Sequence, residues 1–307
     1  MKNKLFTGIR SAIFTPLNSD NTLKSDAVKP LVDFTLDRGV KGFYVCGSTG
    51  EGPALRPTVR MEMAESVIDV CKNRKTVSGD KPDVIVHVGA PDVFDAFELA
   101  KHAEKIGADA ISSLAPNFFA SHGPDDMLAY YKRLADCTSL PILIYATPNL
   151  MNSAGSMYDF MTKAMEIDNV VGLKYTNTFY YQLDRIRKVN GGDINILNGP
   201  DETLLAGLAM GADGGIGSTY NICPEKFVKI YDLYNEGKIE EARKVQSEVN
   251  DIITVLLSAK GGYGMAAKNC MKLFGIDLGH RAWPCGDYSD EDMKALENEL
   301  RKVGVEF

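Results

Sequence analysis

Eight short apolar runs recur along the whole chain and alternate with longer stretches of mixed polarity. The stretches between the runs repeat apolar residues at helical spacing, as in Met61, Ala64, Val67 and Ile68. Strands that alternate with helices pair in parallel, so eight such units predict an α/β fold, a (β/α)8 TIM barrel. The predicted strands cover residues 8–14, 42–46, 84–89, 109–114, 142–146, 170–174, 194–198 and 213–218.

The predicted strands are continuously apolar, as in VIVHVG, ILIYAT and VVGLKY, because both faces of a parallel barrel strand are covered. After the eighth run come helical segments with charged faces, such as IEEARKVQSEVNDIITVLL. We assign residues 1–222 to the barrel core and residues 223–307 to the last barrel helix and a C-terminal helical extension. No low-complexity linker separates the two parts, so they are expected to form one domain.

The composition limits the class of partner. The formal net charge of -7 disfavours nucleic acid and anionic membrane surfaces, so a small-molecule partner is expected. No segment has the roughly 18 unbroken apolar residues of a membrane helix, and the N-terminus lacks a secretory signal, which predicts a cytoplasmic protein. The six cysteines form no CxxC pair and the four histidines lack metal-ligand spacing, so neither a metal nor another cofactor is expected.

In such a barrel, reactive residues lie where the strands end and the following loops begin. Six of the predicted strands end in polar or glycine-rich sequences, so these sequences are expected to converge on one mouth. They are GSTGE (47–51), APNFF (115–119), YATP (145–148), LKYT (173–176), NGPDE (198–202) and GIGSTYN (215–221).

Lys174 ends the sixth run, at a position expected to be buried. Desolvation disfavours an ammonium group, and a neutral amine is a nucleophile that condenses with a ketone to give an imine. Tyr145 ends the preceding strand, and because neighbouring parallel strands lie about 4.8 Å apart, its phenol is expected near the amine, where it could transfer protons. No histidine is evident for that task. The structural alternatives are a lysine that extends to solvent and a core tyrosine.

Other loops offer polar groups for a substrate. Ser48 and Thr49 lie in a glycine-flanked turn whose hydroxyl and backbone N–H groups suit a carboxylate. Asp201 and Glu202 offer acceptor oxygens to a polyhydroxylated ligand. The structural alternatives are a helix N-cap for the first pair and a helix start for the second. The same polar surface is extended by Ser218 and Thr176.

An ordered set of motifs carries a family resemblance that spans nearly the whole chain. The motifs are TGIRSAIFTPLNSD, GFYVCGSTGEG, VIVHVGA, IYATP, GLKYT, LNGPDE and GADGGIGSTYNI. In this order they resemble the superfamily of N-acetylneuraminate lyases and dihydrodipicolinate synthases, which are class I pyruvate aldolases, and within it the lyases most closely.

The resemblance implies a homotetramer in which Lys174 forms a Schiff base with a 2-keto acid and Tyr145 transfers protons. It implies that Ser48 and Thr49 hold the keto acid's carboxylate. The lyase pattern implies reversible cleavage of N-acetylneuraminate, a sialic acid, to N-acetylmannosamine and pyruvate. The positions matched to substrate contacts are Thr176, Gly199, Asp201, Glu202 and Ser218, and Tyr44 matches a further tyrosine of similar enzymes.

The preference for a lyase rests on the substrate end of the site. Synthases of this superfamily typically carry an arginine soon after the tyrosine-to-proline motif, whereas YATPNLMNSAG has none. Phe118 stands where many bacterial relatives have a tyrosine. Two alternatives stay open: another pyruvate-dependent aldolase, such as a dihydrodipicolinate synthase or a 2-keto-3-deoxy sugar acid aldolase, and a non-catalytic sugar-acid sensor.

Overall fold

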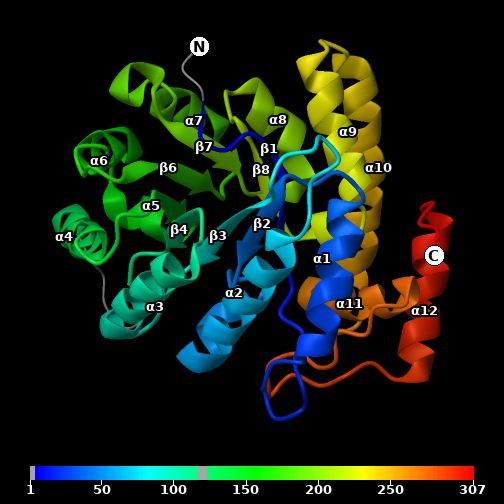
Figure 1. The fold of residues 1–307 in the computed structure, drawn as a ribbon. Coiled ribbons are helices and arrows are strands. Elements are labelled where there is room, and N and C mark those ends of the chain that lie inside the picture. The colour runs from blue at the N-terminus through cyan, green and yellow to red at the C-terminus, as the bar shows by residue number, and fades with distance from the viewer. Residues whose placement is uncertain (1–3, 117–122) are drawn as a thin grey trace.

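The computed structural model describes residues 4–116 and 123–307. Eight parallel strands close into a barrel in chain order, with helices around it (Figure 1). This confirms the predicted TIM barrel with C-terminal helices. The strands are β1 (Gly8–Ala12), β2 (Gly42–Val45), β3 (Asp83–His87), β4 (Ala110–Ser113), β5 (Ile142–Ala146), β6 (Val170–Tyr175), β7 (Asn195–Asn198) and β8 (Gly214–Gly217).

Every predicted run overlaps one strand, but several runs extend past the last paired residue. The first run was expected to end at residue 14, whereas β1 ends at Ala12, which pairs with Tyr44. The apolar residues that follow, Ile13 and Phe14, are still buried. An apolar run therefore predicts burial, which continues past the end of the strand. It does not predict the last residue that pairs with the neighbouring strand.

The helices pack around the strands and continue past β8. The α-helices are α1 (Val28–Leu36), α2 (Pro57–Lys72), α3 (Val93–Ile106), α4 (Pro124–Ala135), α5 (Pro148–Ala154), α6 (Met157–Ala164), α7 (Tyr180–Ile186), α8 (Leu204–Ala209), α9 (Pro224–Asn235), α10 (Ile239–Ser258), α11 (Gly262–Cys270) and α12 (Asp290–Lys302). Short 3-10 helices are η1 (Ser25–Ala27), η2 (Gly52–Ala54), η3 (Val189–Gly192), η4 (Asp201–Thr203), η5 (Thr219–Asn221) and η6 (Met271–Phe274).

Two apolar layers hold the barrel together. The larger one lies between the strands and the surrounding helices. The smaller one fills the barrel interior, because alternate residues of each strand point inward. At the N-terminal end of the barrel, Arg10 is paired with Asp83 through two bonds of 2.6 Å. The interior layer consists of Phe6, Ala12, Tyr44, Ile85, Ala110, Leu143, Leu197 and Ile216.

The C-terminal helices lie to one side of the barrel in Figure 1. Helix α9 contacts β1, and α10 contacts α9, α11 and α12. The chain then returns to the strand ends, where the Leu17 N–H donates to the carbonyl of Leu278 at 3.0 Å. That residues 223–307 form one domain with the barrel stays a prediction.

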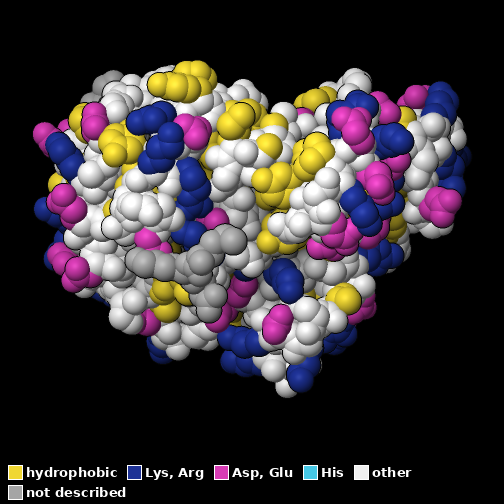
Figure 2. All heavy atoms as spheres, turned by 90° about the horizontal axis from the view of Figure 1, so that it is seen from above, with side chains coloured by type: hydrophobic (Ala, Val, Ile, Leu, Met, Phe, Trp, Pro, Cys, Tyr) yellow, Lys and Arg dark blue, Asp and Glu magenta, His cyan; other side chains and the backbone are white. Residues whose placement is uncertain are grey.

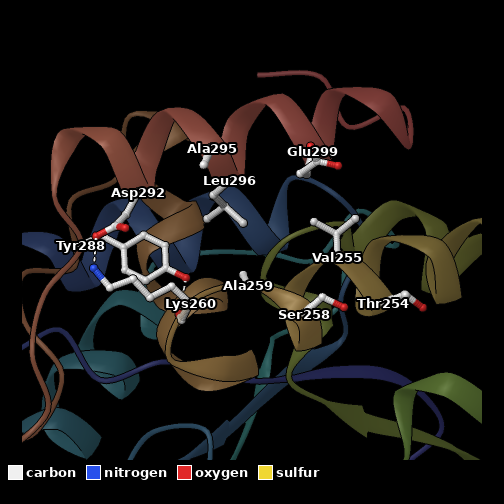
Figure 3. A pocket seen from close by; sticks show the side chains of 10 residues that line it. All are labelled: Thr254, Val255, Ser258, Ala259, Lys260, Tyr288, Asp292, Ala295, Leu296 and Glu299. Atoms are coloured by element: carbon white, nitrogen blue, oxygen red, sulfur yellow. Dashed lines mark hydrogen bonds and ion pairs between the residues drawn. The ribbon is translucent and has the colours of Figure 1, made fainter.

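A pocket of about 300 Å³ lies between α10 and α12 (Figure 3). Val255 of α10 and Leu296 of α12 point into it, and the ion pair of Lys260 with Asp292, at 2.7 Å, lies at one end (Figure 3). Its lining comes from α10, α12 and adjacent segments, so it is separate from the strand ends.

The surface carries both signs of charge. Figure 2 shows Lys and Arg side chains interspersed with Asp and Glu over one face of the molecule. Among the described residues, none of the helices combines the length and apolar character needed to cross a bilayer.

Candidate active site

Lys174 lies inside the barrel near the C-terminal end of β6. It is a register partner of Tyr145 on β5 and Leu197 on β7, and it is 5% exposed. Two residues earlier, a Cβ at Gly172 would lie 1.9 Å from the carbonyl oxygen of Asn195, so only glycine allows β6 to approach β7 this closely. The Nζ atom lies 4.4 Å from the ring centre of Tyr145 and 4.5 Å from that of Tyr44. The expected burial of the amine is therefore observed.

Tyr145 is the residue of β5 that pairs in register with Lys174 of β6, and its side chain carries a phenol. Its hydroxyl oxygen lies 3.5 Å from Ser48 Oγ. Burial alone would raise the pKa of Tyr145, but the charge of Lys174 and the Ser48 hydroxyl oppose this, and the pKa lies below its usual value. The neighbouring Thr176 hydroxyl acts in the same direction without reaching hydrogen-bond geometry. A phenol that releases its proton more readily is suited to proton transfer.

Tyr44 and His87 are buried aromatic side chains next to Tyr145. Tyr44 is fully buried and donates to Ser112 Oγ at 3.0 Å, and burial, followed by the proximity of Tyr145, raises its pKa well above the usual value. The His87 ring lies 5.8 Å from the Tyr145 ring at 89° and 6.0 Å from the Tyr44 ring. Tyr44 is therefore a neutral phenol whose hydroxyl already has a partner.

His87 was not predicted as a site residue, because the spacing of the four histidines along the chain indicates only the absence of a metal-ligand pattern. Its position two residues after Ile85, an interior residue of the same strand, was the available signal. Burial, followed by the charges of Arg60 and Lys174, lowers the pKa of His87 well below its usual value. A neutral imidazole thus packs perpendicular to the ring of Tyr145.

The GSTGE turn lies at the end of β2. Ser48 is exposed at the mouth, and Thr49 Oγ1 lies 2.6 Å from Ser218 Oγ, which joins the loops after β2 and β8. Gly52 closes the turn, because a Cβ there would lie 1.9 Å from the carbonyl oxygen of Cys46. The structure thereby brings the predicted carboxylate-binding hydroxyls to the same mouth as Lys174 and Tyr145.

The loop after β7 places its two carboxylates differently. Asp201 is buried; one of its oxygens accepts the Thr219 N–H at 2.7 Å, and the other has no hydrogen-bond partner among the described residues. Burial raises the pKa of Asp201 to about 6, and the charge of Glu202 adds to this effect. Glu202 itself is exposed. Asp201 thus holds the turn before η5 and keeps one acceptor oxygen unpaired.

Thr176 and Gly199 lie against each other at the ends of β6 and β7. A Cβ at Gly199 would come within 2.1 Å of Thr176 Oγ1, so glycine is required there. The Thr176 hydroxyl is itself buried and has no hydrogen-bond partner in the described parts of the chain. Phe118 lies outside the described residues.

A pocket of about 210 Å³ adjoins the hydroxyls of the mouth. Besides Ser48, Thr49 and Ser218, its lining includes five residues that were not predicted as site residues. They are Phe14, Glu51, Tyr263, Gly264 and Arg281. The last three come from α11 and from the loop after η6, whose approach to the mouth strand-end motifs do not reveal.

Together these groups can perform a defined chemistry. A buried amine beside a phenol of lowered pKa can form an imine and exchange protons. The adjoining turn offers hydroxyls and backbone N–H groups to an anion. Within the described residues, no cluster of three or more His, Cys, Asp or Glu could hold a metal ion.

Proteins of known activity resemble this chain over almost its full length. It is 34% identical over 296 residues to an N-acetylneuraminate lyase of Rhizobium meliloti, covering 96% of this chain and 95% of that protein. It is 31% identical to an N-acetylneuraminate lyase of Mediterraneibacter gnavus, covering 97% of this chain and 92% of that protein.

Solved structures agree with this. The N-acetylneuraminate lyase of Proteus mirabilis superposes with a TM-score of 0.89 at 29% identity, over 99% of this chain and 100% of that chain. The corresponding enzyme of Aliivibrio salmonicida gives a TM-score of 0.90 at 29% identity, over 99% of each chain. The model of the dihydrodipicolinate synthetase family matches residues 5–303. The chain therefore belongs to the dihydrodipicolinate synthetase family.

Proposed function

We propose that the chain is a class I aldolase, an N-acetylneuraminate lyase that cleaves sialic acid reversibly to N-acetylmannosamine and pyruvate. The observation that carries this is the buried Lys174 amine, 4.4 Å from the ring centre of Tyr145, at the mouth of a barrel. The choice of substrate is supported by the lyase relatives, which are 34% and 31% identical over nearly the whole chain.

The reaction begins at the amine. Lys174 Nζ attacks C2 of the open-chain sugar acid, and loss of water gives a protonated imine. A base then removes the proton from the C4 hydroxyl, the C3–C4 bond breaks, and its electron pair moves into the imine. N-acetylmannosamine leaves, and the enamine is protonated at C3 and hydrolysed to pyruvate, which frees the lysine.

Tyr145 is the proposed proton-transfer group, acting with the substrate's own carboxylate. Its lowered pKa and its place beside Lys174 support this role. Ser48 and Thr49 are proposed to bind the keto-acid carboxylate through their hydroxyls and the N–H groups of the turn.

The sugar end is proposed to contact the other side of the mouth. The unpaired oxygen of Asp201 and the unpaired hydroxyl of Thr176 support this, since buried polar atoms without a partner are uncommon in proteins. The remaining proposed sugar contacts are Gly199, Glu202 and Ser218, and Tyr44 is a further proposed substrate-binding residue.

We further propose a cytoplasmic homotetramer that works without a cofactor. The cytoplasmic assignment is supported by the six cysteines, all of which are free thiols. An exposed aromatic cluster at the start of α7 supports association with other copies. It consists of Phe179 and Tyr181, with ring centres 5.8 Å apart, and of Tyr158, which lines the same surface pocket.

The test is borohydride reduction with pyruvate present, followed by peptide mass analysis. Lys174 should carry the reduced pyruvate adduct, and Lys174→Met should carry none. An unmodified Lys174, under conditions that trap a control aldolase, would overturn the mechanism.

Specificity needs a second test. Release of N-acetylmannosamine should be lost in Asp201→Ala/Glu202→Ala while pyruvate trapping persists. Unchanged sugar release in this variant would mean that the proposed contacts are wrong. Coupled assays with aspartate semialdehyde and with other sugar aldehydes would identify a different aldolase, and binding of the sugar acid without turnover would identify a sensor.

A further inference from the structure

The carboxylate of Glu51 links the turn after β2 to the C-terminal part of the chain. One oxygen accepts a hydrogen bond from Lys268 Nζ at 2.9 Å. The other accepts from Arg281 Nε at 3.2 Å and from the Ala282 N–H at 2.9 Å. The Lys268 and Glu51 side chains are 2% and 7% exposed. Both oxygens are therefore held by residues of α11 and of the loop between η6 and α12.

The backbone of this turn is unusual at both ends. Cys46 has a φ of 59° and Glu51 has a φ of 57°, in the left-handed region that residues with a side chain seldom adopt. Ser48 and Thr49 lie between these two residues. Such a conformation persists only where the surroundings hold it, and the contacts of the Glu51 carboxylate do so at one end of the turn.

Arg281 is positioned in turn by Gly264 of α11. A Cβ at Gly264 would lie 3.3 to 3.4 Å from three guanidinium atoms of Arg281, so the guanidinium lies across this glycine. Both residues line the same pocket of about 210 Å³ as Ser48 and Thr49. The C-terminal segment thus forms one wall of the pocket and the hydroxyl-bearing turn forms another.

We infer that Glu51, Lys268 and Arg281 are positioning residues that hold the GSTGE turn in the shape that binds the keto-acid carboxylate. The C-terminal extension is then a part of the active-site framework. The identity of the ligand rests on the proposed function. When the Glu51 contacts are lost, the turn can relax and keto acid binds more weakly, whereas Lys174 and Tyr145 stay on their strands.

The test uses the pyruvate concentration that half-saturates borohydride trapping of Lys174. The double variant Glu51→Gln/Lys268→Met removes the two most deeply buried charges together, so neither is left without its partner. Arg281 keeps its charge, but its side chain is 25% exposed to solvent. Its half-saturating pyruvate concentration should rise about tenfold or more, while the maximal trapping rate changes much less. Arg281→Gln should show a smaller increase, and Lys268→Arg, which keeps the charge, should lie closest to the wild type.

The matched control is Lys260→Met. It breaks the ion pair of Lys260 with Asp292, at 2.7 Å, in the same C-terminal part of the chain. This variant should keep the wild-type half-saturating concentration. Thermal melting of every variant separates a folded protein with weak binding from one that has unfolded.

Two outcomes would overturn the inference. One is a folded double variant with wild-type half-saturation, and the other is an equal change in Lys260→Met. Should the double variant fail to fold, Arg281→Gln decides, because its side chain is 25% exposed in the wild type, and unchanged half-saturation there rejects the inference. Failure of the proposed function looks different: wild-type Lys174 is not trapped, or the wild type releases no sugar.

Discussion

Lys174 and Tyr145 are register partners on β6 and β5, and the Nζ atom lies 4.4 Å from the centre of the phenol ring. Side chains alternate between the two faces of a strand, so a shift of one residue would move one partner out of the barrel. The pairing of β5 with β6 shifts register between Ile142 and Leu143, before the two partners meet. This irregularity sets the alignment on which the proposed chemistry depends.

Tyr145→Phe should lower kcat for sugar-acid cleavage by about 10²- to 10⁴-fold, the usual contribution of a proton-transfer group. Pyruvate trapping at Lys174 should continue, because the amine and the carboxylate-binding turn are intact. Tyr130→Phe is the control, since it removes another buried hydroxyl, which lies 2.7 Å from Ser113 Oγ. Equal kcat values for Tyr145→Phe and the wild type would assign the proton to another group.

Asp201 should make the folded protein less stable as the pH rises. Its folded pKa of about 6 lies above the ordinary aspartate value of 3.8, so the native state binds more protons between these values. The free energy of unfolding of the wild type, relative to Asp201→Asn, should fall across this window by about 3 kcal/mol at most and be level above it. Urea unfolding across the window measures this. A difference that does not change with pH would contradict the buried carboxylate.

His87 should act in the opposite direction. Its folded pKa lies well below 6.5, so the unfolded state binds more protons once the pH falls below that value. The wild type should lose stability relative to His87→Gln on acidification below about pH 6.5, by about 1.4 kcal/mol per pH unit at most. Glutamine stays neutral and keeps an acceptor for the Leu114 N–H, which donates to His87 Nε2 at 3.4 Å. Parallel pH profiles of the two proteins would show that His87 binds a proton as readily in the native state as in the unfolded state, which contradicts a lowered pKa.

Gly199→Ala should impair the sugar end of the site. The added Cβ would lie 2.1 Å from Thr176 Oγ1, so Thr176 must move, at a cost of about 1–3 kcal/mol. Sugar turnover should fall while pyruvate trapping persists. Gly286→Ala is the control, because no atom lies within 4 Å of a Cβ at that position. If the two variants turn over the sugar acid equally well, Thr176 does not contact the sugar.

Much of the fold was predictable because each barrel strand is short, apolar and separated by a helix from the next. The run around VVGLKY placed Lys174 at a strand end, and its burial followed from the parallel topology. The turn at Ser48 and the loop at Asp201 were predictable for the same reason, since strand ends of a barrel face one mouth.

Contacts that depend on side-chain packing were not predictable. Adjacent carboxylates in NGPDE read alike in sequence, yet Asp201 is buried against η5 and Glu202 is exposed. His87 looked unremarkable because its pKa is lowered by burial and then by the charges of Arg60 and Lys174, and all three depend on other elements.

The sequence by itself determined the eight strand–helix units and the amine at the end of β6, because hydrophobic period and turn residues are local properties of the chain. The tertiary structure alone decided that Glu51 meets Lys268 across 217 residues of sequence. It also decided that Thr49 meets Ser218, because closing the barrel brings the ends of β2 and β8 to one mouth. Such pairings join residues that are far apart in the sequence. They form only when the whole chain is folded, so local sequence patterns do not predict them.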